Sequence, residues 1–198
     1  MSEMFLATER FAVTQRLTMM VNRYEVRELR DGVPGELFAM AQQKRMALRE
    51  SVTFYADEDR RQPVFGFRAD RKIDLAATYA VTDGTGRTIG SFRKDFARSL
   101  LRSTWHLEQP GMGSLVGQER NAVVAILRRV WEFIPFLNSI PFVWPLHFDF
   151  SADNDTVVLS VERGISLRDR YVVTVHYPAL DRRLAAAVAV GLDALMSR

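Results

Sequence analysis

The feature that most constrains this chain is an apolar run near its C-terminus. Residues 184–192 read Leu-Ala-Ala-Ala-Val-Ala-Val-Gly-Leu, without a polar side chain. A proline at position 178 suits the first turn of a helix, and we predict a helix over 178–196. A helix that is apolar on every face must be buried in protein or in lipid. Because a bilayer span takes about 20 apolar residues and this run stops at Asp193, we expect burial in protein.

The residues before this helix read as many short strands. Alternating runs separated by turn residues extend from about Phe11 to Asp83. The clearest pair, 77–82 and 87–92, flanks an Asp-Gly-Thr-Gly turn, and Asp-Gly between alternating runs is a strong hairpin signal. Later strand-like runs are 103–107, 147–150, 156–161 and 171–176. Roughly ten or more short strands at this spacing are typical of a sandwich or a barrel.

Together, the strands and the apolar helix predict a barrel wrapped around that helix. The small residues Ala185, Ala189 and Gly191 would let the strands approach the helix closely. We therefore expect a β-rich α+β chain that forms a single domain over residues 1–198.

The composition limits which binding partners and which cellular compartment we expect. Lys+Arg 27 against Asp+Glu 24 gives a net charge of +3, too small an excess to imply nucleic acid by itself. The absence of cysteine removes disulfides and thiolate metal sites, and suits a reducing compartment. The N-terminus lacks the basic start and long apolar run of a secretory signal. We expect a cytoplasmic protein for which nucleic acid is an unlikely partner.

A second helix is predicted over 122–134, where apolar residues recur every three or four positions until Pro135 ends the pattern. It leads into a segment, 131–146, that is rich in aromatic residues and proline. This segment either plugs one end of the barrel or forms an exposed patch that docks on a membrane or a partner. The candidate contact residues are Trp131, Phe133, Phe136, Phe142 and Trp144.

A run of basic residues is the main candidate for ligand binding. Cations at 93–102 are interleaved with Phe96, Leu100 and Leu101. Such a mixture can hold an anionic head group while the apolar side chains enter the membrane interface. The alternative is a solvated surface segment between strands. The candidate residues are Arg93, Lys94, Arg98 and Arg102, with Lys44 and Arg45 as further members of the same face.

The sequence gives little support for phosphate binding, metal binding or catalysis. The glycines at 84–90 suggest a phosphate loop, but such a loop needs a helix directly after it, and here strands flank it. The three histidines (His106, His147 and His176) lack the spacing of metal ligands, and the acidic residues at 149–155 lack the pattern of a calcium loop. No nucleophile elbow or acid–base carboxylate pair is present. We expect a non-enzymatic protein with no cofactor and no metal.

Several segments resemble the LURP-one-related family. They are Tyr24–Val26, Phe38–Lys44, Ser51–Tyr55, Tyr79–Asp83, Gly86–Lys94, Asp169–Val173 and Leu180–Leu184. The resemblance implies the Tubby-like fold, a closed antiparallel barrel of about twelve strands around a buried C-terminal helix. Tubby domains read phosphoinositides and phospholipid scramblases are associated with lipid movement, so these relatives imply lipids as ligands.

The function that we expect is peripheral binding to anionic phospholipid or to a membrane surface. The basic run would capture the lipid electrostatically, and the aromatic segment would act as an apolar foot. The alternative is a protein-interaction or scaffold module that uses segment 131–146 to dock a protein partner.

Overall fold

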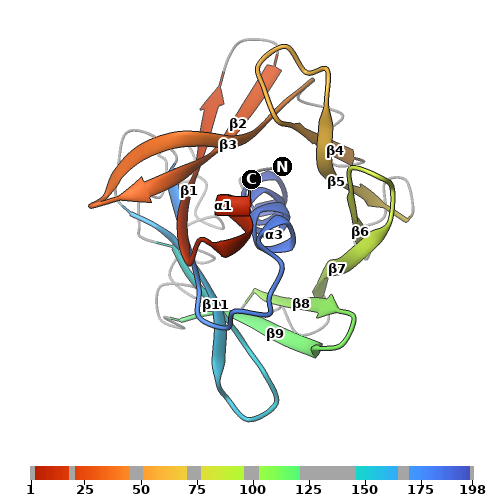
Figure 1. Cartoon of the computed structure of the whole chain (residues 1–198). Coiled ribbons are helices and arrows are strands. Elements are labelled where there is room, and N and C mark those ends of the chain that lie inside the picture. Colours follow the sequence, from red (N-terminus) through yellow and green to blue (C-terminus); the bar gives the residue numbers. More distant parts are fainter. Residues whose placement is uncertain are drawn as a thin grey trace, which may run out of the picture.

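The computed structural model describes residues 3–17, 21–44, 51–70, 77–95, 103–120, 146–164 and 170–196. Twelve antiparallel strands follow one another around a single closed barrel, and β1 pairs with β12 to complete it. Figure 1 shows this ring with α3 inside it. The predicted twelve-stranded barrel around a C-terminal helix is confirmed.

The strands are short and alternate in direction. They are β1 (Arg10–Leu17), β2 (Val21–Arg30), β3 (Val33–Lys44), β4 (Ser51–Tyr55), β5 (Pro63–Ala69), β6 (Thr78–Asp83), β7 (Thr88–Asp95), β8 (Thr104–Gln109), β9 (Gly113–Glu119), β10 (Leu146–Ser151), β11 (Val157–Arg163) and β12 (Arg170–Val175). The described helices are α1 (Glu3–Ala7) and α3 (Arg182–Met196). The helix predicted over 122–134 lies outside the described residues.

Helix α3 fills the barrel. Its apolar run from Leu184 to Leu192 is buried on every face, as the sequence predicts. The helix begins at Arg182, however, and not at Pro178, so the predicted start is corrected. The reason is that Asp181 caps the helix, accepting a hydrogen bond from the backbone N–H of Arg183 at 2.9 Å, while Pro178 lies in the turn before it.

Two glycines allow the helix and the wall to meet. A Cβ atom on Gly191 of α3 would lie 2.6 Å from the Phe92 ring on β7. A Cβ on Gly90, near the start of β7, would lie 2.6 Å from the side chain of Leu184. The small residue Gly191 therefore serves the close approach that the sequence predicts.

The barrel has two distinct ends. We call the end where α3 begins the proximal end and the opposite one the distal end. Because the strands alternate in direction, the connections alternate between the ends as well. The proximal connections are 31–32, 56–62, 84–87, 110–112, 152–156 and 176–181, and the distal ones are 18–20, 45–50, 70–77, 96–103, 120–145 and 164–169.

Helix α1 packs at the proximal end. Its Phe5 is fully buried, with ring centroids 5.3 Å from Phe11 and 5.1 Å from Phe38. The helix contacts α3 inside the ring (Figure 1). No helix in the described ranges is long and apolar enough to cross a bilayer.

Candidate functional sites at the barrel ends

The segments that hold the predicted basic and aromatic residues connect strands whose ends lie at the distal end. Strand β3 finishes there at Lys44, β7 at Asp95 and β9 at Glu119, and β10 starts there at Leu146. Arg45, Arg98, Arg102 and the aromatic residues Trp131, Phe133, Phe136, Phe142 and Trp144 lie outside the described residues. The strand ends that flank these segments nevertheless share one end of the barrel, which sequence alone could not establish.

Arg93 and Lys94 are neighbours on β7 and lie on opposite sides of the barrel wall. Arg93 pairs with His106, whereas Lys94 pairs with Trp105, which is fully buried. Successive side chains on a strand point to opposite faces. Arg93 therefore faces outward and Lys94 faces the interior near the distal end.

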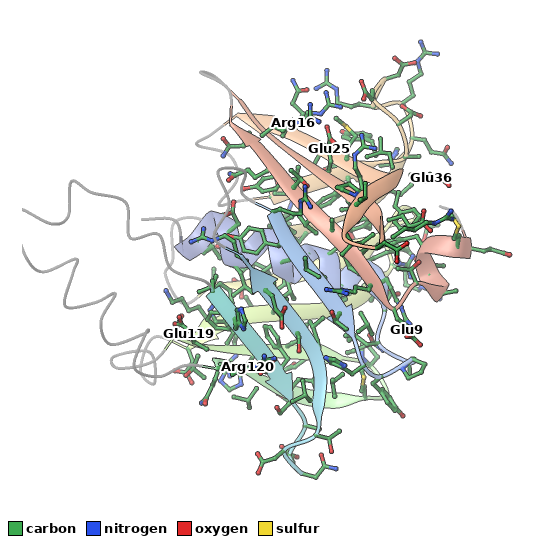
Figure 2. All side chains as sticks on the ribbon, turned by 90° about the vertical axis from the view of Figure 1, so that its left-hand side faces the viewer. Glu9, Arg16, Glu25, Glu36, Glu119 and Arg120 are labelled. Carbon is green, nitrogen blue, oxygen red and sulfur yellow. The ribbon has the colours of Figure 1, made fainter. Side chains whose placement is uncertain are left out.

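The connections at the two ends differ in charge. The residues between strands at the distal end comprise ten basic and five acidic residues. Those at the proximal end, including 176–181, comprise three basic and seven acidic residues. Figure 2 labels Glu9 and Glu36 towards the proximal end, and Glu119 and Arg120 towards the distal end. By sequence and strand order, the distal connections therefore carry a net positive charge and the proximal connections a net negative one.

A buried polar cluster joins α3 to the wall towards the distal end. Asp193 is 2% exposed and accepts hydrogen bonds from the hydroxyls of Tyr24 at 2.8 Å and Tyr171 at 2.7 Å. Burial first, and then the charge and hydrogen bond of Asp193, raise the pKa of both tyrosines well above the usual range. Sequence reasoning missed this cluster, although an aspartate that ends an apolar run is a signal for it.

A polar cluster on the outer wall involves Arg120, Asp149, Ser160 and His176. Arg120 donates to both oxygens of Asp149, at 2.6 and 2.8 Å. Ser160 also donates to Asp149, at 2.7 Å, and its Oγ lies 3.0 Å from His176 Nε2. Ser160 therefore links the carboxylate of Asp149 to the ring of His176. The cluster ties β10 and β11 to the residues that follow β9 and β12.

The glycine-rich and acidic motifs both lie in turns between strands. The glycines at 84–90 form the β6–β7 hairpin, in which Gly86 has a φ of +88° and no helix follows. Asp153, Asn154 and Asp155 lie in the β10–β11 turn. Within the described ranges, no group of three or more histidine, aspartate or glutamate side chains is placed to hold a metal ion.

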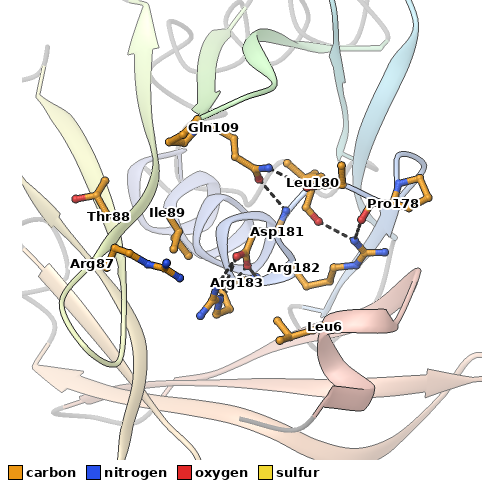
Figure 3. Close-up of a pocket in the computed structure, with 12 residues that line it drawn as sticks. Leu6, Arg87, Thr88, Ile89, Gln109, Pro178, Leu180, Asp181, Arg182 and Arg183 are labelled. Atoms are coloured by element: carbon orange, nitrogen blue, oxygen red, sulfur yellow. Dashed lines mark hydrogen bonds and ion pairs between the residues drawn. The ribbon is translucent and has the colours of Figure 1, made fainter.

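A pocket opens at the proximal end, which we call the proximal pocket. Its volume is about 520 Å³. As Figure 3 shows, it lies between α1, the β6–β7 hairpin and the start of α3. The residues around it are Leu6, Arg87, Thr88, Ile89, Gln109, Pro110, Pro178, Ala179, Leu180, Asp181, Arg182 and Arg183.

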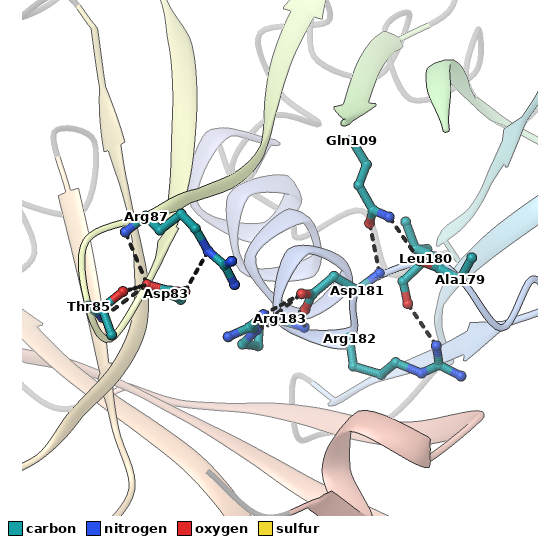
Figure 4. Close-up of polar contacts among 9 residues, drawn as sticks. All are labelled: Asp83, Thr85, Arg87, Gln109, Ala179, Leu180, Asp181, Arg182 and Arg183. Carbon is teal, nitrogen blue, oxygen red and sulfur yellow. Dashed lines mark hydrogen bonds and ion pairs between the residues drawn. The ribbon is translucent and has the colours of Figure 1, made fainter. Parts of the chain in front are cut away.

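Polar contacts hold the rim of this pocket (Figure 4). The side chain of Gln109 donates to the carbonyl of Ala179 and accepts from the backbone N–H of Asp181, both at 2.8 Å. Arg183 pairs with Asp181. Across the pocket, hydrogen bonds from the side chain of Thr85 and from backbone N–H groups, with the charge of Arg87, lower the pKa of Asp83 to about 2.

Comparison with known proteins gives one family match. Residues 39–193 match the family model described as LURP-one-related. No curated protein matches. Among solved structures, the chain is similar to the crystal structure of a porin-like protein from Bacteroides uniformis, with 8% identity and a TM-score of 0.23 over 84% of this chain and 95% of that one. A TM-score this low carries no argument about function.

Proposed function

The chain belongs to the LURP-one-related family, as its sequence resemblance predicts, and on that premise we propose that it is a non-enzymatic domain that binds anionic membrane surfaces with its distal end. The observation that carries this proposal is the difference in charge, by sequence, between the connections of the two ends. The distal connections hold ten basic and five acidic residues, against three and seven at the proximal end. A membrane that carries anionic lipid attracts the basic end and repels the acidic one.

The size of this attraction is sufficient for reversible binding. A basic residue close to an anionic leaflet contributes about 1 kcal/mol, and the attraction fades beyond a Debye length of about 8 Å at physiological salt. A net excess of several charges gives a useful affinity only when they gather at one end. The topology of the barrel supports such a gathering, because the six distal connections all join strand ends at the same end of the barrel.

Apolar side chains would strengthen the contact. The distal connection 120–145 contains Trp131, Phe133, Phe136, Phe142 and Trp144. Aromatic side chains favour the interface between lipid and water. Arg98 and Arg102, in the connection 96–103, supply cations to the same end of the barrel. We place Lys44, Arg45 and Arg93 in supporting positions, as the neighbouring cations of this face.

The test compares two double charge reversals in co-sedimentation with vesicles. One variant changes Arg98→Glu and Arg102→Glu at the distal end. The matched control changes Arg60→Glu and Arg61→Glu in the proximal connection 56–62, where Arg61 is 83% exposed. Both variants alter the net charge equally, so a difference between them reports the end that binds. Thermal unfolding of each variant checks that it folds.

We expect wild-type protein to bind phosphatidylserine vesicles and not phosphatidylcholine vesicles, more weakly as salt rises. The distal variant should lose most of this binding and the proximal control should keep it. Equal loss in both variants would show only a dependence on net charge and would contradict the proposal. If the wild-type protein binds neither vesicle, the proposal fails. If it binds a partner protein instead, and Phe142→Asp abolishes that binding, the protein-interaction module is favoured.

A further inference from the structure

A second site lies at the other end of the barrel from the proposed membrane face. We propose that the proximal pocket binds a small organic acid, with its carboxylate against Arg87 and Arg183 and its apolar body on Leu6 and Ile89. This proposal does not depend on membrane binding, because the two sites are built from different connections.

The pocket is an open hollow on the surface of the proximal end. Its volume of about 520 Å³ is large enough for a small organic acid. Leu6, Ile89 and Leu180 provide apolar lining, and Leu6 on α1 is 39% exposed. Figure 3 shows that these side chains and the arginines surround the same space. The pocket therefore combines an apolar surface with cationic groups.

Arg182 makes the pocket electrostatically incomplete. Its side chain donates to the carbonyl oxygens of Thr8, Pro178 and Leu180, and the residue is only 5% exposed. Among the described residues, no carboxylate lies within ion-pair distance of it. The carbonyls satisfy its hydrogen bonds but do not neutralise its charge, and a buried charge without a counter-charge is costly. An anion in the pocket would supply the counter-charge.

Two further arginines have donors available for that anion. Arg87 is 77% exposed and contacts Asp83 through Nε alone, at 3.3 Å. Arg183 contacts Asp181 through Nε and Nη2. Within the described ranges, the Nη groups of Arg87 and the Nη1 group of Arg183 make no hydrogen bond.

The balance of charge around the pocket points to one anionic group. Among the described residues at the pocket, Asp83 pairs with Arg87 and Asp181 with Arg183, which leaves the positive charge of Arg182 without a counter-charge. Arginine forks suit carboxylates, which accept two parallel hydrogen bonds. The apolar lining next to them favours an acid that carries a short hydrocarbon body over a bare anion such as inorganic phosphate.

The experiment is a titration of the full chain, followed by ¹H–¹⁵N NMR, with hexanoate, acetate, 1-hexanol and inorganic phosphate. Hexanoate should shift the amides of Thr88, Gln109 and Leu180–Arg183, and should bind at least about tenfold more tightly than acetate, because acetate lacks the buried methylenes. Hexanol and phosphate should bind no better than acetate. If hexanol matches hexanoate, or if phosphate binds most tightly, the proposed ligand class is overturned.

Variants then assign the two halves of the ligand. Arg87→Gln should lower the affinity for hexanoate about tenfold and leave the affinity for hexanol unchanged. Leu6→Ser should lower the affinity for hexanoate towards that for acetate. The controls are Arg60→Gln and Val33→Ser, which are exposed at the same end and do not border the pocket. Equal affinity in Arg87→Gln and wild type, or shifts confined to other amides, would overturn the site. Vesicle binding by the same Arg87→Gln protein should stay intact, so the two proposals can fail separately.

Discussion

At the scale of single residues, Glu25 shows how the outer wall can bury a charge. It faces outward from β2, yet it is 2% exposed and lies beneath three arginines. Its carboxylate is 2.9 Å from Arg27, 3.1 Å from Arg23 and 3.6 Å from Arg16, the last of which is labelled beside it in Figure 2. Burial would raise the pKa of Glu25, but the hydrogen bond from Arg27 and the three positive charges outweigh it and hold the pKa below its usual range.

Glu25→Gln should therefore destabilise the fold by about 1.5–3 kcal/mol at neutral pH, because it removes a charged hydrogen-bond acceptor and the counter-charge of partly exposed arginines. The measurement is urea unfolding. Since the pKa of Glu25 in the folded chain is depressed from 4.5, its contribution is complete above that value and is lost as pH falls through the folded-state pKa. The gap between variant and wild type should narrow in acid.

A matched control for this prediction is Glu58→Gln. Glu58 pairs with Arg23 at 2.8 Å but its side chain is 65% exposed, so the change should cost less than about 1 kcal/mol. A gap between Glu25→Gln and wild type that widened in acid would contradict the explanation.

The hydroxyls bound to Asp193 allow a second prediction. Asp193→Ala would leave the buried hydroxyls of Tyr24 and Tyr171 without an acceptor, and each orphaned group costs about 1–3 kcal/mol. We expect a loss of about 2–5 kcal/mol in urea unfolding. The same change in a Tyr24→Phe, Tyr171→Phe background should cost clearly less, because no hydroxyl is then orphaned. Equal costs in the two backgrounds would show that Asp193 acts through other contacts.

At the scale of elements, α3 is fitted to its barrel by residues that conflict with helix propensity. Glycine inside a helix costs about 1 kcal/mol relative to alanine. Gly191 nevertheless lies in the last half of α3, where a Cβ would lie 2.6 Å from the Phe92 ring. Packing thus outweighs propensity at this position.

Gly191→Ala tests which of the two effects is larger. Propensity alone predicts a gain of about 1 kcal/mol, whereas overpacking typically costs about 1–3 kcal/mol. We expect net destabilisation, measured by thermal unfolding. Ala194→Gly, at a partly exposed position of the same helix, serves as the control and should show the propensity cost alone. A more stable Gly191→Ala protein would mean that β7 moves aside easily.

Helix α1 is an element that exists because of one side chain. Five residues are too few for a helix that is stable by itself. Phe5→Ala should cost about 3–5 kcal/mol, since it empties a buried aromatic position next to Phe11 and Phe38. Met4→Ser, at a position that is 36% exposed, should change stability little. A small effect of Phe5→Ala would show that α1 packs only weakly on the barrel.

At the scale of the whole molecule, the architecture is predictable from local signals. The Asp83–Gly86 turn between alternating runs predicts a hairpin, and the apolar run 184–192 predicts a buried helix. Each prediction depends on only a few neighbouring residues. Where two local signals compete, the prediction fails by a few residues: Pro178 suits a first turn, but Asp181 is the cap.

The surfaces are not predictable in the same way. The proximal pocket joins Leu6, Arg87, Gln109 and Arg183, which become neighbours only when the barrel closes. Glu25 faces outward from β2, and its burial depends on Arg16, Arg23 and Arg27, which the pairing of β1 with β2 brings around it. The predicted membrane face remains a prediction, because most of its residues lie outside the described ranges.

Closure of the ring leads to the last prediction. The barrel closes where the first strand, β1, pairs with the last, β12, and we call this pairing the seam. Val13 lies opposite Tyr171 there, although the two residues are far apart in the sequence. In an open sheet these would be edge strands with unpaired backbone groups, but a closed barrel has no edges. We expect amides of β1 and β12 to exchange hydrogen only through global unfolding, as slowly as those of β7 and β8. Native-state hydrogen exchange in low denaturant measures this directly. Faster exchange confined to the seam would show instead that the barrel opens there before it unfolds.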